Sequence, residues 1–90
     1  MLSGDDAVVL QAQGDRFVEA IEAYRTAHGN YPTTFGDAGI TPADTATKFG
    51  PWIYMHSGTD PSFEISVGDY GRNNFALWWN SSHPHWYLDQ

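Results

Sequence analysis

Apolar residues recur every three or four positions along the first third of the chain. On a helical wheel with 100° per residue they form a single stripe centred on Phe17. The stripe consists of Ala7, Leu10, Gly14, Phe17, Ile21, Tyr24 and His28, and the opposite side carries Gln11, Asp15, Glu19, Glu22 and Thr26. This spacing predicts an amphipathic helix over residues 3–29, with Leu10, Phe17, Ile21 and Tyr24 as the helix side of the core.

The ends of this helix carry their own signals. Ser3 is a suitable N-cap, and Asp5 and Asp6 favour the positive end of the helix dipole. Gly29 suits the left-handed residue that commonly follows a helix, and Pro32 prevents the helix from continuing.

The first turns of the predicted helix are apolar on every side. Val8 lies about 180° from Phe17 on the wheel, so it points away from the expected core. One interpretation is that Val8, Val9 and Leu10 are assembly contacts with a neighbouring subunit. The other is that loops of the chain itself cover this aliphatic run. The pattern leaves both open.

After Gly50 the apolar period changes from 3.6 to 2, which is typical of strands. We expect strands near residues 52–56, 63–67, 75–79 and 86–88, with turns at 57–62, from 68, and at 80–85. Short turns between consecutive strands favour an antiparallel meander. The prediction is therefore a single α+β domain over residues 1–90: a helix at 3–29, an ordered loop at 30–50 with a helical turn after Thr41, and a sheet at 51–89.

The net charge of the chain limits the kinds of molecule that it can bind. The 90 residues carry 11 acidic and 4 basic side chains, for a net charge of −7. This balance disfavours nucleic acid and anionic membrane surfaces, because both are bound through Lys and Arg. The chain has no cysteine, hence no disulfide and no thiolate metal site.

The helix exit carries a family resemblance. Residues 22–35, Glu-Ala-Tyr-Arg-Thr-Ala-His-Gly-Asn-Tyr-Pro-Thr-Thr-Phe, resemble the exit in type IV pilins and type II secretion pseudopilins. The tail, with Trp79-Asn80-Ser81 followed by Trp86-Tyr87-Leu88-Asp89, is similar to the closing hairpin of that superfamily.

The resemblance implies a structural, non-enzymatic subunit of a filament, whose partners are other pilin-like subunits. It also implies a hydrophobic N-terminal anchor, absent from this sequence, that would hold the protein in the bacterial inner membrane with its head in the periplasm or in an extracellular filament. We expect the chain without that anchor to be a monomer or a weak dimer, because a few exposed apolar side chains barely offset the entropy of association.

Metal and catalytic motifs are weak in comparison. His83 and His85, even with His56, are too few for a closed zinc site, so we interpret residues 83–85 as a polar turn and predict no metal site. Asp60 and Asp69 lie in loops and could supply oxygens to calcium, which some major pseudopilins bind, but turn chemistry explains them better. A metal-dependent enzyme is the most distant alternative.

The abundant aromatic residues support another function. Trp78 and Trp79 should point to opposite faces of one strand, one into the core and one outward. An outward Trp near Trp86 or Tyr87 could stack on a sugar or on a partner protein. Trp78, Trp79, Trp86 and Tyr87 are therefore a candidate surface platform, and a small carbohydrate- or protein-binding module is the alternative function.

Overall fold

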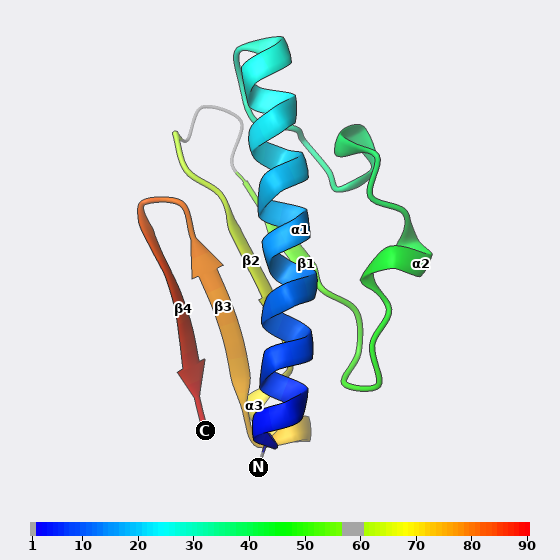
Figure 1. Ribbon diagram of the computed structural model, residues 1–90, viewed down its shortest axis with the longest axis vertical. Coiled ribbons are helices and arrows are strands. Elements are labelled where there is room, and N and C mark those ends of the chain that lie inside the picture. Colours follow the sequence, from blue (N-terminus) through cyan, green and yellow to red (C-terminus); the bar gives the residue numbers. More distant parts are fainter. Residues whose placement is uncertain (1, 57–60) are drawn as a thin grey trace.

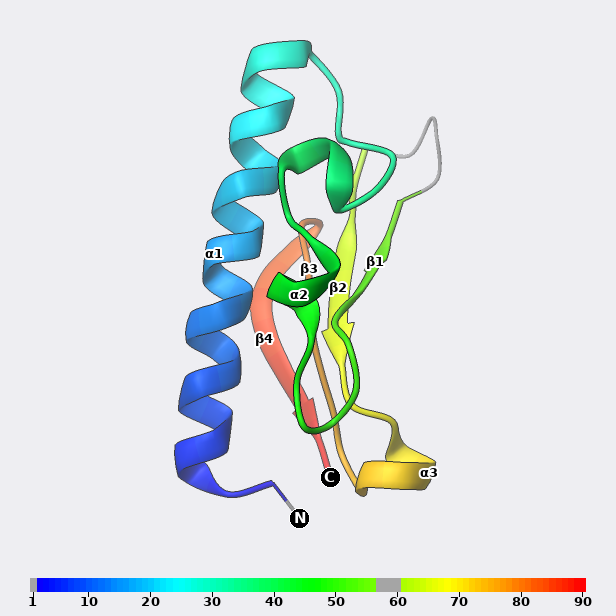
Figure 2. The same cartoon turned by 90° about the vertical axis from the view of Figure 1, so that its right-hand side faces the viewer.

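A long helix lies across one face of a four-stranded antiparallel sheet, which is the predicted α+β architecture (Figure 1). The computed structural model describes residues 2–56 and 61–90. Seen from the side, the helix and the sheet form two layers, and an irregular segment runs along one edge of their junction (Figure 2). Within residues 2–56 and 61–90, no helix covers the opposite face of the sheet.

Helix α1 spans Gly4–His28 and has the predicted caps. The Ser3 hydroxyl accepts a hydrogen bond from the Asp6 amide at 3.1 Å, which satisfies one of the free amides of the first turn. At the other end Gly29 has φ of 83°, a left-handed conformation in which a Cβ would be strained, and its amide donates to the Arg25 carbonyl.

The segment between helix and sheet is ordered by two short helices, η1 (Gly36–Ala38) and α2 (Pro42–Thr45). The helical turn predicted after Thr41 is present as α2. Its capping box is complete: the Thr41 hydroxyl accepts from the Asp44 amide, and the Asp44 carboxylate accepts from the Thr41 amide at 2.8 Å. These hydrogen bonds to Thr41 lower the pKa of Asp44.

The strands follow one another in space in the order of the sequence. They are β1 (Ile53–Met55), β2 (Glu64–Val67), β3 (Ala76–Asn80) and β4 (His83–Asp89), and each neighbouring pair is antiparallel. Residues Ile53, Ser66, Trp78 and Tyr87 form one row across the sheet, and Tyr54, Ile65, Trp79 and Trp86 form the next. Directly paired residues share a face, so these two rows lie on opposite faces.

One turn prediction was wrong and another was incomplete. Residues 83–85, interpreted as a polar turn, belong to β4, and the turn itself is Ser81–Ser82. The edge position of β4 and a register shift between Trp79 and Asn80 accommodate Pro84. The turn expected from residue 68 contains a short helix, α3 (Tyr70–Asn73), which the Asp69 side chain caps. Most of the turn expected at 57–62 falls on residues 57–60, outside the described residues.

The core lies between α1 and the sheet. Its buried apolar members are Leu2, Leu10, Phe17, Ile21, Ile40, Trp52, Phe63, Ile65, Val67, Phe75 and Leu77. Three of the four predicted helix contributors, Leu10, Phe17 and Ile21, belong to this cluster. Tyr24 does not: it is half-buried and stacks on His28 with ring centroids 4.1 Å apart. Figure 2 gives the reason, since the last turns of α1 extend past the ends of the strands.

No helix among residues 2–56 and 61–90 has the length and apolar character needed to cross a bilayer.

Candidate functional site

The first turns of α1 expose two large aliphatic side chains to solvent. Val8 is 70% exposed and Val9 is 65% exposed, and we call this pair the collar. The alternative in which loops cover the run is therefore wrong for both. Leu10, predicted as a third assembly contact, is only 4% exposed and packs in the core, so it is not available to a partner.

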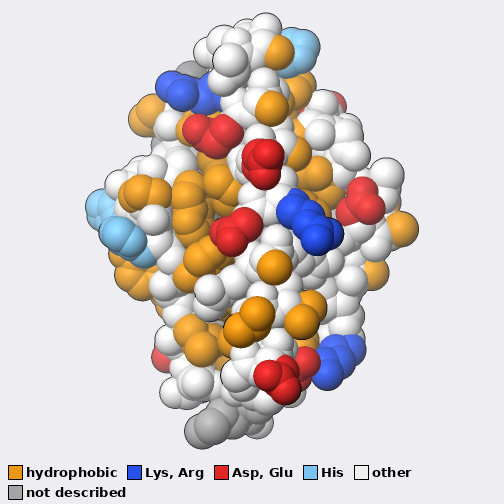
Figure 3. Space-filling view, in the orientation of Figure 1, with side chains coloured by type: hydrophobic (Ala, Val, Ile, Leu, Met, Phe, Trp, Pro, Cys, Tyr) orange, Lys and Arg blue, Asp and Glu red, His pale blue; other side chains and the backbone are white. Residues whose placement is uncertain are grey.

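A groove runs beside the collar, between the first half of α1 and the segment before β1. The helix contributes Asp6, Val8, Val9, Leu10, Ala12, Gln13 and Arg16, and the segment contributes Ala46, Thr47, Lys48 and Phe49. In the space-filling view, hydrophobic side chains follow the lower half of α1 and basic side chains lie to its right (Figure 3). The groove thus has an apolar floor and a charged rim.

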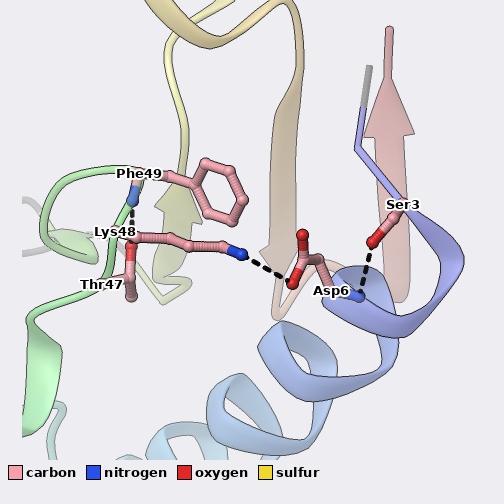
Figure 4. Close-up of polar contacts among 5 residues, drawn as sticks. All are labelled: Ser3, Asp6, Thr47, Lys48 and Phe49. Atoms are coloured by element: carbon pink, nitrogen blue, oxygen red, sulfur yellow. Dashed lines mark hydrogen bonds and ion pairs between the residues drawn. The ribbon is translucent and has the colours of Figure 1, made fainter.

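A short polar network fixes the far wall of the groove (Figure 4). The Thr47 hydroxyl accepts from the Phe49 amide at 3.0 Å and donates to the Gly50 carbonyl at 2.5 Å. Lys48 then reaches across to Asp6, with 3.2 Å between Nζ and a carboxylate oxygen. Because the Lys48 side chain is 69% exposed, this ion pair positions the wall and adds little stability.

The Phe49 ring connects this wall to the core. Its centroid lies 5.0 Å from that of Phe75 in an edge-to-face arrangement, and the Lys48 ammonium lies 5.3 Å from the ring centroid. The packing of Phe49 against Phe75 therefore holds the wall against the sheet.

The charge of the groove differs from that of the molecule. Arg16 and Lys48 line it, and they are two of only four basic residues in a chain of net charge −7. Asp6 is the only acidic residue among the groove residues named above, so their formal charge is +1. Arg16 is exposed and makes no ion pair within the described part of the chain. The groove therefore suits an acidic partner with an apolar side chain.

The four aromatic residues of the predicted platform are divided between the two faces of the sheet. Trp78 and Tyr87 lie on the outer face, with ring centroids 5.8 Å apart and planes 15° from parallel. Trp79 and Trp86 face the helix and pack against the core. The predicted opposite orientation of Trp78 and Trp79 is confirmed, but the four residues form no single platform, because neighbouring residues alternate between faces.

Trp86 packs tightly against α1. Its indole nitrogen donates to Asp15 at 2.9 Å, and its ring lies edge-on to Trp52 with centroids 5.8 Å apart. A Cβ on Gly14 would stand 2.2 Å from the Trp86 ring and 2.9 Å from the Trp52 ring. Gly14 therefore allows the two indoles to approach the helix backbone, which accounts for a glycine in the middle of α1.

Glu22 is less solvated than the wheel predicts. It is half-buried, and its Oε1 has no hydrogen-bond partner in the part of the chain that the structure describes. Burial, together with the hydrogen bond and negative charge of Glu22, raises the pKa of Tyr31. Arg25 lies over the same ring, 5.1 Å from its centroid. These contacts attach the helix exit to α1.

The residues considered for metal binding have structural roles or lie apart. The Asp69 carboxylate accepts from the Gly71 amide at 2.8 Å. His83 and His85 are exposed on β4. Asp60 is outside the described residues. Within residues 2–56 and 61–90, no three His, Asp or Glu side chains gather closely enough to hold a metal ion.

Comparison of the sequence with protein-family models, with curated proteins and with solved structures finds no significant match. Function is therefore inferred from the chain's own geometry and from its helix-exit motif. Sequence reasoning identified the collar but missed the groove, because Arg16, Lys48 and Phe49 come from segments that are far apart along the chain. The one local feature of the sequence that could have indicated the groove was Lys48 next to Phe49, in a chain with few basic residues.

Proposed function

We propose that the protein is the head domain of a filament subunit of the type IV pilin or type II secretion pseudopilin kind. It catalyses no reaction. In this proposal a hydrophobic segment precedes Ser3, anchors the subunit in the bacterial inner membrane and later packs inside the filament, while the head lies in the periplasm or in an extracellular filament. The partners are other pilin-like subunits.

The observation that carries this proposal is the exposure of Val8 and Val9 on the first turns of a 25-residue helix. Burying both side chains in a contact would contribute roughly 3–6 kcal/mol, at about 1.5–3 kcal/mol each. Val8 and Val9 are neighbours and line a groove with Ala12, Ala46 and Phe49, and contiguous apolar surface of this kind is typical of interaction sites.

The arrangement of elements supports the proposal in a second way. Only one face of α1 packs on the sheet, and the end of α1 that carries the collar lies beside the N-terminus (Figure 1). A segment joined ahead of Ser3 would enter beside this end of α1, near the collar. To continue the helix axis, it would have to replace the extended conformation of Ser3 and displace Leu2 from the core. The helix-exit motif at residues 22–35, which resembles that of type IV pilins and pseudopilins, also supports the proposal.

A chimera tests the proposal. The leader and hydrophobic segment of a well-characterised pseudopilin are joined ahead of Ser3, and the chimera is produced in a bacterium that assembles that pseudopilus. We expect this chain in filaments sheared from the cell surface. As a control, the same segment is joined to an unrelated small acidic domain, which should stay in the membrane. A chimera that inserts in the membrane but never enters the sheared fraction contradicts the proposal.

A second candidate function is supported by the Trp78–Tyr87 pair on the uncovered face of the sheet. Flanked by Ser66 and Glu64, the two rings offer an apolar surface next to hydrogen-bonding groups, as carbohydrate- and protein-binding faces do. Titration with neutral oligosaccharides, followed by tryptophan fluorescence, tests it. The expected change in signal is lost in Trp78→Ala and kept in Trp86→Phe, and an unchanged Trp78→Ala response would exclude this face.

A further inference from the structure

We infer that the groove beside the collar receives the end of β4, at Leu88 and Asp89, from a second copy of this chain. The inference rests on the proposed function, since it assumes that copies assemble, and it specifies which two surfaces meet. The acceptor is the groove wall with Val9 and Arg16. The donor is the last part of an edge strand.

The groove and the end of β4 carry complementary charges. The groove has a net positive lining on a strongly acidic molecule, so a second copy offers acidic surface in excess. Arg16 has no ion-pair partner within the described residues, and Asp89 is exposed and has none there either. Pairing Asp89 with Arg16 would neutralise both charges at the rim of an apolar contact, and such complementarity favours one orientation of the partner.

The end of β4 is an exposed part of an edge strand. β4 is the last strand in the order β1-β2-β3-β4, so one of its edges has no strand beside it among the residues that the structure describes. Leu88 pairs with the buried Leu77 and shares its face, yet it is 40% exposed. Because neighbouring residues of a strand point to opposite faces, the strand end presents Leu88 on one face and Asp89 on the other. A strand end of this kind matches a groove with an apolar floor and a basic rim.

The groove and the end of β4 lie on different sides of the subunit. In Figure 1 the end of β4 lies on one side of α1, and the segment between α2 and β1, which includes Lys48 and Phe49, lies on the other. A contact between two different surfaces on opposite sides of a subunit is head-to-tail. After two copies meet, one keeps a free groove and the other a free strand end, so further copies can add until the assembly closes into a ring or continues as an open filament.

The contact is weak for isolated heads. It buries few side chains, and their gain is largely cancelled by the entropy of association. It becomes effective when an anchor concentrates the heads on one membrane, where the second binding event takes place at high effective concentration. The experiment therefore traps the contact covalently in concentrated protein.

The chain contains no cysteine, so no native thiol competes with the introduced cysteines in disulfide trapping. A chain with Val9→Cys is mixed with a longer, tagged chain with Leu88→Cys and oxidised, and the heterodimer is quantified. The matched control replaces Leu88→Cys by Ala23→Cys, another exposed position. We expect several-fold more heterodimer from the Val9→Cys and Leu88→Cys pair. Arg16→Glu in the first chain should lower the yield roughly fivefold, and adding Asp89→Arg in the second chain should restore it.

The outcomes separate the two proposals. Equal yields with Leu88→Cys and Ala23→Cys, or a yield that Arg16→Glu does not change, overturn this pairing of surfaces. If the chimera nevertheless enters filaments, the proposed function is kept and only the pairing of the groove with the end of β4 is rejected. If the chimera also fails to assemble, both proposals are rejected. Far-ultraviolet circular dichroism and urea midpoints of each variant establish that the exposed substitutions leave the fold intact.

Discussion

Val8 and Ile21 show how the position of an aliphatic side chain on one helix determines its contribution to the stability of the fold. Ile21 is fully buried, whereas Val8 on the opposite side is 70% exposed. Ile21→Ala should lower the free energy of unfolding by about 2–5 kcal/mol, through lost burial and the cavity that remains. Val8→Ala, the matched control, should change it by less than about 0.5 kcal/mol. Urea unfolding measures both, and equal midpoints for the two variants would show that the stripe faces elsewhere.

Tyr54 should make stability depend on alkaline pH. Its hydroxyl donates to the Pro32 carbonyl at 2.7 Å, and burial, with smaller effects from Tyr31 and Asp37, raises its pKa from 10.0 to about 12. The folded state therefore favours the neutral phenol. This contribution is complete below pH 10 and is lost as pH rises toward 12.

Tyr54→Phe tests this dependence. At neutral pH the variant should lose about 0.5–1.5 kcal/mol with the hydrogen bond to Pro32. Between pH 10 and about 12 its stability should fall less steeply than that of the parent protein, because the substituted side chain cannot ionise. Tyr31, whose pKa is also raised, is still present in the variant and contributes to the fall in stability that remains. Parallel curves from urea unfolding at several pH values would rule out Tyr54 as the cause.

At the scale of elements, the packing of α1 on the sheet depends on the space that Gly14 leaves for Trp86. Gly14→Ala improves helix propensity by about 1 kcal/mol, yet its Cβ would overlap the Trp86 ring, so we expect a net loss of stability of about 1–3 kcal/mol. With Trp86→Ala in the background, Gly14→Ala should be much less harmful. The double-mutant cycle should give a coupling of about 0.5–3 kcal/mol. Additive effects would contradict the close contact.

Local signals explain which elements could be predicted. The stripe, the Ser3 and Gly29 caps and the Thr41 capping box act between residues close in sequence, so α1 and α2 could be predicted from the sequence. The start of β4 could not be predicted from the sequence, because a Pro between two His residues, as at Pro84, is typical of a turn. Its strand geometry depends on pairing with β3 and on a register shift that local reasoning does not contain.

At the scale of the whole molecule, the collar could be predicted from the sequence but the groove could not. The position of Val8 opposite the stripe indicates exposure, so the collar follows from periodicity. The groove depends on the path of the segment before β1, which brings Lys48 to within 3.2 Å of Asp6 across more than forty residues of chain. Such contacts follow from tertiary packing and leave no periodic trace in the sequence.

The central claim is that the collar is a subunit contact, and filament yield tests it most directly. In the chimera that carries a pseudopilin anchor, Val8→Asp with Val9→Asp would place two charges in the contact. The matched control, Ala23→Asp with Ala27→Asp, alters two exposed positions near the other end of the same helix. Neither pair removes a buried contact, because all four positions are exposed. The control pair should lower the urea midpoint more than the collar pair, because Asp replaces Ala near the negative end of the helix dipole, so a loss of filament in the collar variant alone cannot come from lost stability. We predict that the collar variant reduces sheared filament at least about tenfold, equivalent to about 1.4 kcal/mol per contact, while the control leaves it unchanged. Equal filament yield from both variants would contradict the account.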